Sequence, residues 1–387
     1  MKNSPLGVFN GECAPAFSPL LQTYRQQIEL GSDKASSLAV YLRGELVFNY
    51  AASIDPEKTW KTSDRICTMS ACKGPLALCI LQLVEREKLA LDMPVAHYWP
   101  AFGHNGKEAV TVRQVLNHTA GIPVVKAAKS GDIFNWHAMI NAIEKSPLTF
   151  TPGENMAYHA LTYGHILGEL IKRIDGRSPG DYFHQEFSTA FDIEYDLHAR
   201  DNQPLHDVIS TRQFSPMLLT IYSKILPLIS HWKLQYFNPC SSQYNPNSHE
   251  WRTSEIPAVT GQGSARGLAK FYSLMASTGN TVDHTPVSQL TLDNIFSSNV
   301  TMREKASNKQ WHMALGFMRN SPDFAAMGPN ANTVGHFGMG GSVGFIDPDN
   351  QLSFAYVTAD YHQPTRRDPS MAGERLNQLI ETCYECL

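Results

Sequence analysis

A serine and a lysine stand three residues apart at the start of an apolar stretch with a helical pattern, TMSACKGPLALCILQLVEREKL, which begins at Thr68. Residues three apart share one face of a helix, so the amine of Lys73 could reach the hydroxyl of Ser70. A free serine is a weak nucleophile and needs a neighbouring base, and lysine can serve where burial disfavours its charged form. Unpaired backbone N–H groups at a helix start could also stabilise an oxyanion. The spacing therefore predicts nucleophilic catalysis by Ser70 with Lys73 as its partner.

The thiol between these two residues does not share their geometry. Cys72 adjoins Lys73 and so points to another face of the predicted helix, on the same stripe as Cys79. Such a pair is typical of small apolar core residues. Cys72 is therefore not the predicted nucleophile.

Two other serines satisfy catalytic patterns. Ser230 and Lys233 form a second S-x-x-K, which shows how easily this short pattern occurs by chance. The stretch GGSVG at 340–344 satisfies G-x-S-x-G, but a nucleophile elbow needs a strand, a sharp turn and then a helix. Because Ser342 is followed by a hairpin pattern, we interpret it as part of a glycine-rich strand edge.

The elements that must position these residues follow from the hydrophobic pattern. Apolar and polar side chains alternate along residues 36–53, with a turn at Arg43-Gly44, and this pattern predicts an antiparallel hairpin. Helices are predicted at about 72–88, 111–118, 160–176, 263–277 and 370–385, and strands at 313–319, 333–339 and 342–358. Strands near both chain ends with helices between them predict an α/β fold: one antiparallel sheet built from both ends, flanked by helices, with an inserted, mainly helical lobe.

The same pattern predicts the domain boundaries. Residues 1–70 and 262–387 are expected to form the sheet domain, and residues 71–261 the helical lobe. Within the lobe, about 192–257 is irregular and rich in Tyr, Phe, Trp, Asn and Pro. A long irregular stretch in a compact protein is usually a lid or a pocket wall. We expect this segment to supply an aromatic pocket wall.

Composition excludes several classes of function. A net charge of -4 gives no electrostatic reason to expect nucleic acid or an anionic membrane surface as a partner. No apolar run reaches the roughly 18 residues of a membrane span, and no signal-peptide pattern is seen, so a cytoplasmic location is expected. The seven scattered cysteines fit a reduced compartment, and C-x-x-C at 383–386 is interpreted as a helix end. Without metal-ligand spacing, neither metal nor cofactor is expected.

Four motifs occur together in one order: Ser70-x-x-Lys73, LNHTAGIP at 116–123, TPGENMAYHALTYGHILGELI at 151–171 and GHFGMGGSVGFIDPDNQ at 335–351. This order resembles the serine β-lactamase-like superfamily, in the branch of class C β-lactamases, D,D-peptidases and family VIII carboxylesterases. The resemblance spans roughly residues 36–385. Family VIII carboxylesterases are the most similar group, because they also alter the K-T-G motif and carry a non-nucleophilic G-x-S-x-G serine.

The resemblance implies a role for several residues. Ser70 would be acylated, with Lys73 as its partner, and Tyr158 stands where the family has the tyrosine of Y-x-N. A phenol linked to Lys73 could take the serine proton and later hand it to the leaving group. The backbone N–H groups of Ser70 and Met339 would form the oxyanion hole. The substrate-binding K-T-G motif corresponds here to His336, Phe337 and Gly338.

Two departures from the family pattern bear on the substrate. Ala160 replaces the asparagine of Y-x-N, and His336 replaces a lysine that would attract a substrate carboxylate. Histidine is mostly neutral at pH 7 and is expected to bind a carboxylate only once protonated, below about pH 6.5. Both departures weaken the case for β-lactams. The prediction is a serine hydrolase that cleaves small-molecule carboxylic esters.

Two alternatives stay open at this stage. The same Ser/Lys/Tyr site could serve a β-lactamase, an amidase or D-aminopeptidase, or an acyltransferase. The fold could also be that of a non-catalytic binding member, although the presence of all three residues argues against it. The oligomeric state and the natural ester are not predicted.

Overall fold

The structure is a computed structural model that describes most of the chain. The described residues are 7–200, 205–209, 225, 232, 235, 238–239, 245–276, 285–361 and 370–387. Ser230 and Lys233 of the second S-x-x-K lie outside them, as does much of the predicted pocket wall at 192–257.

The main sheet has nine strands in the order β1-β3-β2-β12-β11-β10-β9-β8-β7, and every neighbouring pair is antiparallel. The strands are β1 (Val8–Cys13), β2 (Ala35–Leu42), β3 (Glu45–Ser53), β7 (Val300–Arg303), β8 (Gln310–Ala314), β9 (Phe317–Arg319), β10 (Val334–Phe337), β11 (Val343–Asp347) and β12 (Leu352–Thr358). Leu38 of β2 pairs with Tyr356 of β12, which joins the two chain ends. The predicted α/β fold with one antiparallel sheet from both ends is confirmed.

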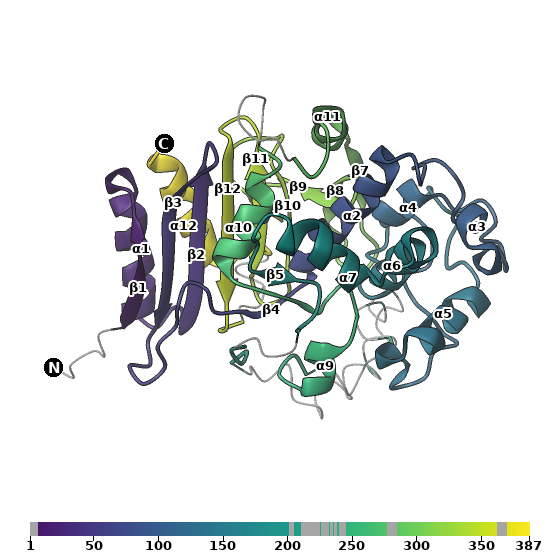
Figure 1. The fold of residues 1–387 in the computed structure, drawn as a ribbon, viewed down its shortest axis with the longest axis horizontal. Helices are drawn as coiled ribbons and strands as arrows, with labels where there is room; N and C mark the ends of the chain where they lie inside the picture. Colours follow the sequence, from purple (N-terminus) through teal and green to yellow (C-terminus); the bar gives the residue numbers. More distant parts are fainter. Residues whose placement is uncertain are drawn as a thin grey trace.

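Helices lie on both sides of this sheet and beyond its far edge (Figure 1). They are α1 (Ser18–Glu29), α2 (Lys73–Glu85), α3 (Val95–Tyr98), α4 (Val112–Leu116), α5 (Trp136–Lys145), α6 (Thr162–Asp175), α7 (Pro179–Phe183), α9 (His249–Thr253), α10 (Ala265–Ser273), α11 (Gln289–Ser297) and α12 (Gly373–Glu385). In Figure 1, α10 crosses in front of β2 and β12, while α3–α6 gather at the opposite end from α1 and α12. None of the described helices is long and apolar enough to cross a membrane.

A second, three-stranded sheet was not predicted from the sequence. It has the order β4-β6-β5, formed by β4 (Ile66–Met69), β6 (Gly261–Gly263) and β5 (Tyr195–Asp196). These strands are too short for an alternating pattern to be visible. Strand β4 ends at Met69, and a short 3-10 helix, η2 (Ser70–Cys72), begins at the next residue. The second sheet therefore fixes the position of Ser70. Met69 has a φ of 52°, a strained conformation for a non-glycine residue.

One predicted strand is wrong. The stretch 313–319 is a tight hairpin between β8 and β9 rather than a single strand. Leu315 and Gly316 form its turn, with φ values of 49° and 97°. A side chain at Gly316 would collide with Ala77 of α2. The turn is therefore buried against a helix. Because a buried turn is apolar, its sequence resembles that of a strand.

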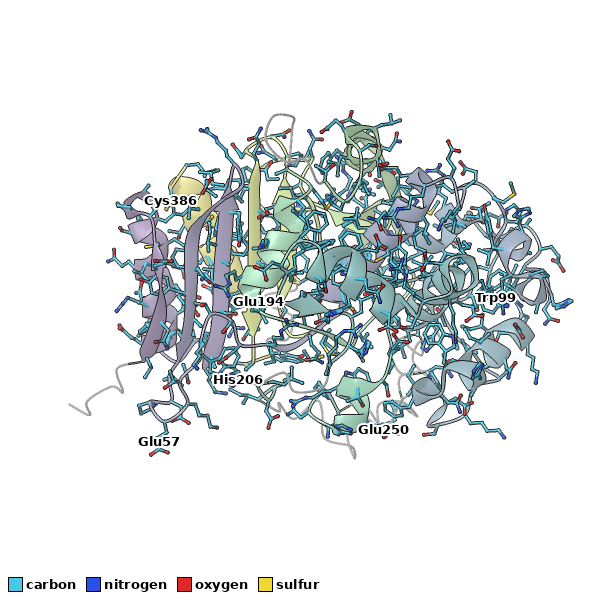
Figure 2. All side chains as sticks on the ribbon, in the orientation of Figure 1. Glu57, Trp99, Glu194, His206, Glu250 and Cys386 are labelled. Carbon is cyan, nitrogen blue, oxygen red and sulfur yellow. The ribbon has the colours of Figure 1, made fainter. Side chains whose placement is uncertain are left out.

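The C-terminal C-x-x-C lies at the end of a helix. Cys383 is buried in α12, and the thiol of Cys386 at the helix end donates to the carbonyl of Thr382 at 3.2 Å. Figure 2 places Cys386 at the sheet end of the molecule, opposite Trp99 in the helical part.

Candidate active site

Ser70 and Lys73 meet at the junction of η2 and α2. The Nζ of Lys73 lies 3.2 Å from the Oγ of Ser70, as the spacing predicted. The same Nζ also donates to the carbonyl of Ala160 at 3.0 Å and to that of Ala258 at 2.8 Å. These two carbonyls come from the loop before α6 and the loop before β6. Three separate parts of the chain therefore hold one amine.

This arrangement fixes the orientation of the amine. Nitrogen is tetrahedral, so two N–H bonds to carbonyls leave one further position, which faces Ser70. In the ammonium form that position holds a proton, whereas in the neutral amine it holds the lone pair. The side chain of Lys73 is fully buried, and this desolvation lowers its pKa to about 7. Near neutral pH, a substantial fraction of Lys73 can therefore accept the serine proton.

Ester turnover is expected to rise with pH through about 7. Below this pKa Lys73 is an ammonium without a lone pair, and above it Lys73 is a base, so kcat/KM should fall about tenfold per pH unit on the acid side. The measurement is kcat/KM for an uncharged ester between pH 5.5 and 9, corrected for hydrolysis without enzyme. A flat profile, or a rise that continues without levelling off to pH 9, as expected for the ordinary lysine pKa of about 10.4, would contradict the assignment.

Tyr158 lies directly beside this amine. Its ring centroid is 4.8 Å from the Nζ of Lys73, and its side chain is almost fully buried. Trp311 of β8 packs on one side of the ring at 5.1 Å and His118 on another at 4.7 Å. The structure therefore brings together Ser70, Lys73 and Tyr158, the three residues predicted for catalysis.

Three buried histidines surround this cluster, and only His336 was singled out from the sequence. His159 donates from Nδ1 to the carbonyl of Ala157 and accepts the N–H of Ile122 at Nε2, so it is locked as a neutral ring. His118 accepts the N–H of His159 at Nδ1, which leaves its proton on Nε2. Burial lowers the pKa of His159 to about 4 and that of His118 well below its usual range. These two histidines therefore add no positive charge beside Lys73 at neutral pH.

The burial of His336 bears on the expectation that it would bind a carboxylate only once protonated. The side chain is only 1% exposed, and Nδ1 donates to the carbonyl of Phe337 at 2.8 Å. Burial, followed by the charge of Lys73, lowers the pKa of His336 to about 3. The expectation that it protonates below about pH 6.5 is therefore wrong. His336 is therefore neutral at pH 5.5 and above.

The end of β10 lies against the backbone that carries the nucleophile. A β-carbon at Gly338 would collide with the carbonyl of Thr68 and would lie 3.3 Å from the backbone nitrogen of Ala71. Only glycine allows this approach. Within the described residues, the backbone N–H of Ser70 and that of Met339 have no hydrogen-bond acceptor. The N–H groups of Ser70 and Met339 remain the predicted oxyanion hole.

The rival nucleophiles lie in settings that disfavour attack. Ser342 is fully buried, its Oγ accepts the N–H of Thr358, and strand β11 follows it where an elbow would need a helix. Cys72 is also buried, and its thiol donates to the carbonyl of Pro257 at 3.3 Å. Burial raises the pKa of Cys72 to about 12, so little thiolate forms at neutral pH.

Comparison with known proteins identifies the family of this chain. The β-lactamase family model matches residues 26–375. The chain therefore belongs to the β-lactamase family, and the predicted resemblance is confirmed. The proteins that match this chain include esterases and a penicillin-binding protein homologue, and the chain is a member of a β-lactamase-fold serine hydrolase family.

Three relatives illustrate this range. The chain is 26% identical over 365 residues to the esterase/β-lactamase LipL of Mycobacterium tuberculosis, a match that covers 90% of this chain and 82% of LipL. The crystal structure of a family VIII carboxylesterase superposes with a TM-score of 0.84 at 26% identity, over 98% of this chain and all of the other. A penicillin-binding protein homologue from Caulobacter crescentus superposes with a TM-score of 0.83 at 25% identity, with the same coverage.

Proposed function

We propose that this protein is a carboxylesterase that hydrolyses small esters through a covalent acyl-enzyme on Ser70. The observation that carries the proposal is the amine of Lys73, which two backbone carbonyls hold with its remaining position toward the Oγ of Ser70. That geometry suits a base that removes a proton from a nucleophile. It has no evident purpose in a protein that only binds.

In the proposed mechanism, neutral Lys73 accepts the proton of Ser70 as Oγ attacks the ester carbonyl. The N–H groups of Ser70 and Met339 stabilise the negative charge that develops on the carbonyl oxygen. Collapse of this intermediate breaks the ester C–O bond, and the alkoxide takes a proton that passes from Lys73 by way of Tyr158. Water then attacks the acyl-enzyme and gives a proton to the same pair. The pair returns this proton to the Oγ of Ser70 as the acyl–Oγ bond breaks, and the carboxylic acid leaves.

The surroundings of this machinery favour esters over β-lactams. A β-lactam also asks the enzyme to hold a side-chain amide and a carboxylate. Ala160 offers only its backbone carbonyl, which already accepts from Lys73, and His336 is buried and neutral. The missing charge-assisted bond to the carboxylate costs on the order of 1.5–3 kcal/mol, or about ten- to a hundredfold in kcat/KM, and the missing neutral bond to the amide costs about 0.5–1.5 kcal/mol more.

Short-chain p-nitrophenyl esters are therefore expected to be hydrolysed at least about a hundredfold faster than a chromogenic cephalosporin, in terms of kcat/KM. The ratio should not move toward the cephalosporin between pH 7.5 and 5.5, because His336 does not gain a proton in that range. The measurement is a panel of esters of graded chain length with one cephalosporin at both pH values.

The same assays, extended to peptide amides, an added alcohol and a serine-directed probe, distinguish the alternatives. A cephalosporin that is hydrolysed faster than every ester would make the protein a β-lactamase. Poor turnover of all of these with good turnover of peptide amides would indicate an amidase, and product formed only with an added alcohol would indicate an acyltransferase. A chain that neither turns over nor reacts with a serine-directed probe would be a binding member of the fold.

A further inference from the structure

Glu304 is a buried carboxylate that sequence reasoning did not single out. It follows β7 directly, and its side chain is 0% exposed. Its Oε1 accepts the backbone N–H of Tyr158 at 3.1 Å and the side-chain amide of Gln235 at 2.9 Å. Its Oε2 accepts the N–H of Ser307 at 2.6 Å, and both oxygens lie 3.1 Å from the N–H of Ala306.

These donors explain how a carboxylate can be buried at this place. A buried carboxylate is costly unless hydrogen bonds satisfy it, and bonds to an ionised acceptor are among the stronger ones in proteins. Two of the donors belong to its own turn, at two and three residues beyond Glu304, and they fix the carboxylate in space. The bond to Tyr158 then reaches across to a segment far away in sequence.

The same turn holds the catalytic tyrosine at two further points. The N–H of Lys305 donates to the carbonyl of Met156, two residues before Tyr158. The hydroxyl of Ser307 accepts the indole N–H of Trp311, whose ring packs on that of Tyr158 at 5.1 Å. The turn after β7 therefore contacts both the backbone and the ring of the residue that lies beside Lys73.

We propose that Glu304 is a positioning residue, which holds Tyr158 beside Lys73 through the hydrogen bond from the Tyr158 backbone N–H to its buried carboxylate. The inference rests on the proposed function, because it matters for catalysis only if Tyr158 transfers protons. Among the described residues, the hydrogen bonds of the Glu304 carboxylate go to backbone N–H groups and to Gln235, and none goes to Ser70 or Lys73. Its effect on rate is exerted through the place of the phenol, and a misplacement of about 1 Å can cost about a hundredfold in rate.

Asp347 provides a matched control elsewhere in the fold. It is also a fully buried carboxylate, at the last position of strand β11, and it accepts the N–H groups of Asp349 and Asn350, two and three residues further on. It lies at the opposite end of β11 from Val343, which pairs with Phe337 next to the site. Asp347 thus stabilises a turn in the same manner without contact to the catalytic cluster.

The test separates two roles of Glu304: the stabilisation of its own turn and the hydrogen bond to the N–H of Tyr158. In Glu304→Asp the shorter carboxylate can still accept from its own turn, as Asp347 does, but it no longer reaches the N–H of Tyr158. We expect kcat for a p-nitrophenyl ester to fall about ten- to a hundredfold, with KM within about threefold of wild type. Glu304→Gln, which puts an amide among N–H donors, should lower kcat at least as much. Asp347→Asn should lower the melting temperature and leave kcat within about threefold.

A double-mutant cycle decides whether the effect passes through the tyrosine. In a Tyr158→Phe background, Glu304→Asp should reduce kcat by less than about threefold, because the phenol that it positions is already gone. Losses that multiply, or an equal loss of kcat in Asp347→Asn, would overturn the inference. If Tyr158→Phe alone leaves kcat unchanged while Ser70→Ala abolishes it, the proposed role of Tyr158 is at fault. If Tyr158→Phe is crippling but Glu304→Asp is not, only the positioning role fails.

Discussion

Replacement of Ser70 with alanine is expected to lower kcat for ester hydrolysis by at least about ten-thousandfold, because no other group can form the acyl-enzyme. The hydroxyl of Ser70 is the one to which the amine of Lys73 is directed. A fluorophosphonate probe should therefore label the wild-type protein on the peptide that contains Ser70. Mass spectrometry of the digested protein locates the adduct, and stopped turnover in the labelled protein confirms that the adduct blocks the reaction.

Ser342 and Cys72 supply the controls for this experiment. Ser342→Ala removes a buried acceptor of the N–H of Thr358, so it should cost about 1 kcal/mol of stability and little activity. Cys72→Ala should likewise leave turnover largely intact, since the thiol is buried and protonated. An adduct on Ser342, or loss of turnover in Ser342→Ala with activity retained in Ser70→Ala, would refute the assignment.

Local geometry explains why the contact between Ser70 and Lys73 could be predicted from sequence. The relation between Ser70 and Lys73 depends only on positions three apart at a helix start, and the structure retains it although the first turn is a 3-10 helix. The hairpin of β2 and β3 is equally local, because Arg43 and Gly44 have the positive φ values of its turn.

The groups that hydrogen-bond to Lys73 and Tyr158 lie far from them in the sequence, and for this reason they could not be predicted from it. Lys73 bonds to the backbone carbonyls of Ala160 and Ala258, and a carbonyl is present whatever the side chain. The carboxylate of Glu304 reaches Tyr158 from a turn far along the chain, and an isolated glutamate after a short strand carries no recognisable pattern.

Burial also determines the protonation state of His336, which cannot be predicted from residue types alone. His336 was expected to titrate near its ordinary pKa, but enclosure beside Lys73 keeps it neutral. A pattern of residue types gives the position of such a group along a strand. It does not give the exposed fraction of its side chain, which depends on every element that packs around it.

Lys73 and Tyr158 are expected to act as one unit in proton transfer. Lys73→Ala removes the base, and Tyr158→Phe removes the hydroxyl that carries the proton onward to the leaving group. Each should lower kcat about a hundred- to ten-thousandfold with a smaller change in KM. The kcat of the double variant should be little lower than that of the worse single variant, because either substitution alone already prevents the same proton transfer.

Tyr163 provides a matched control for the loss of a phenol beside this amine. Its ring is also buried, 5.8 Å from the Nζ of Lys73, but its hydroxyl donates to the backbone carbonyl of Lys73 and not to the amine. Tyr163→Phe should therefore keep kcat within about threefold of wild type. Steady-state kinetics of the four variants on one ester, with melting temperatures to establish folding, complete the test. Losses that multiply in the double variant would show that Lys73 and Tyr158 act in separate steps, and an equal loss in Tyr163→Phe would assign the effect of Tyr158 to packing.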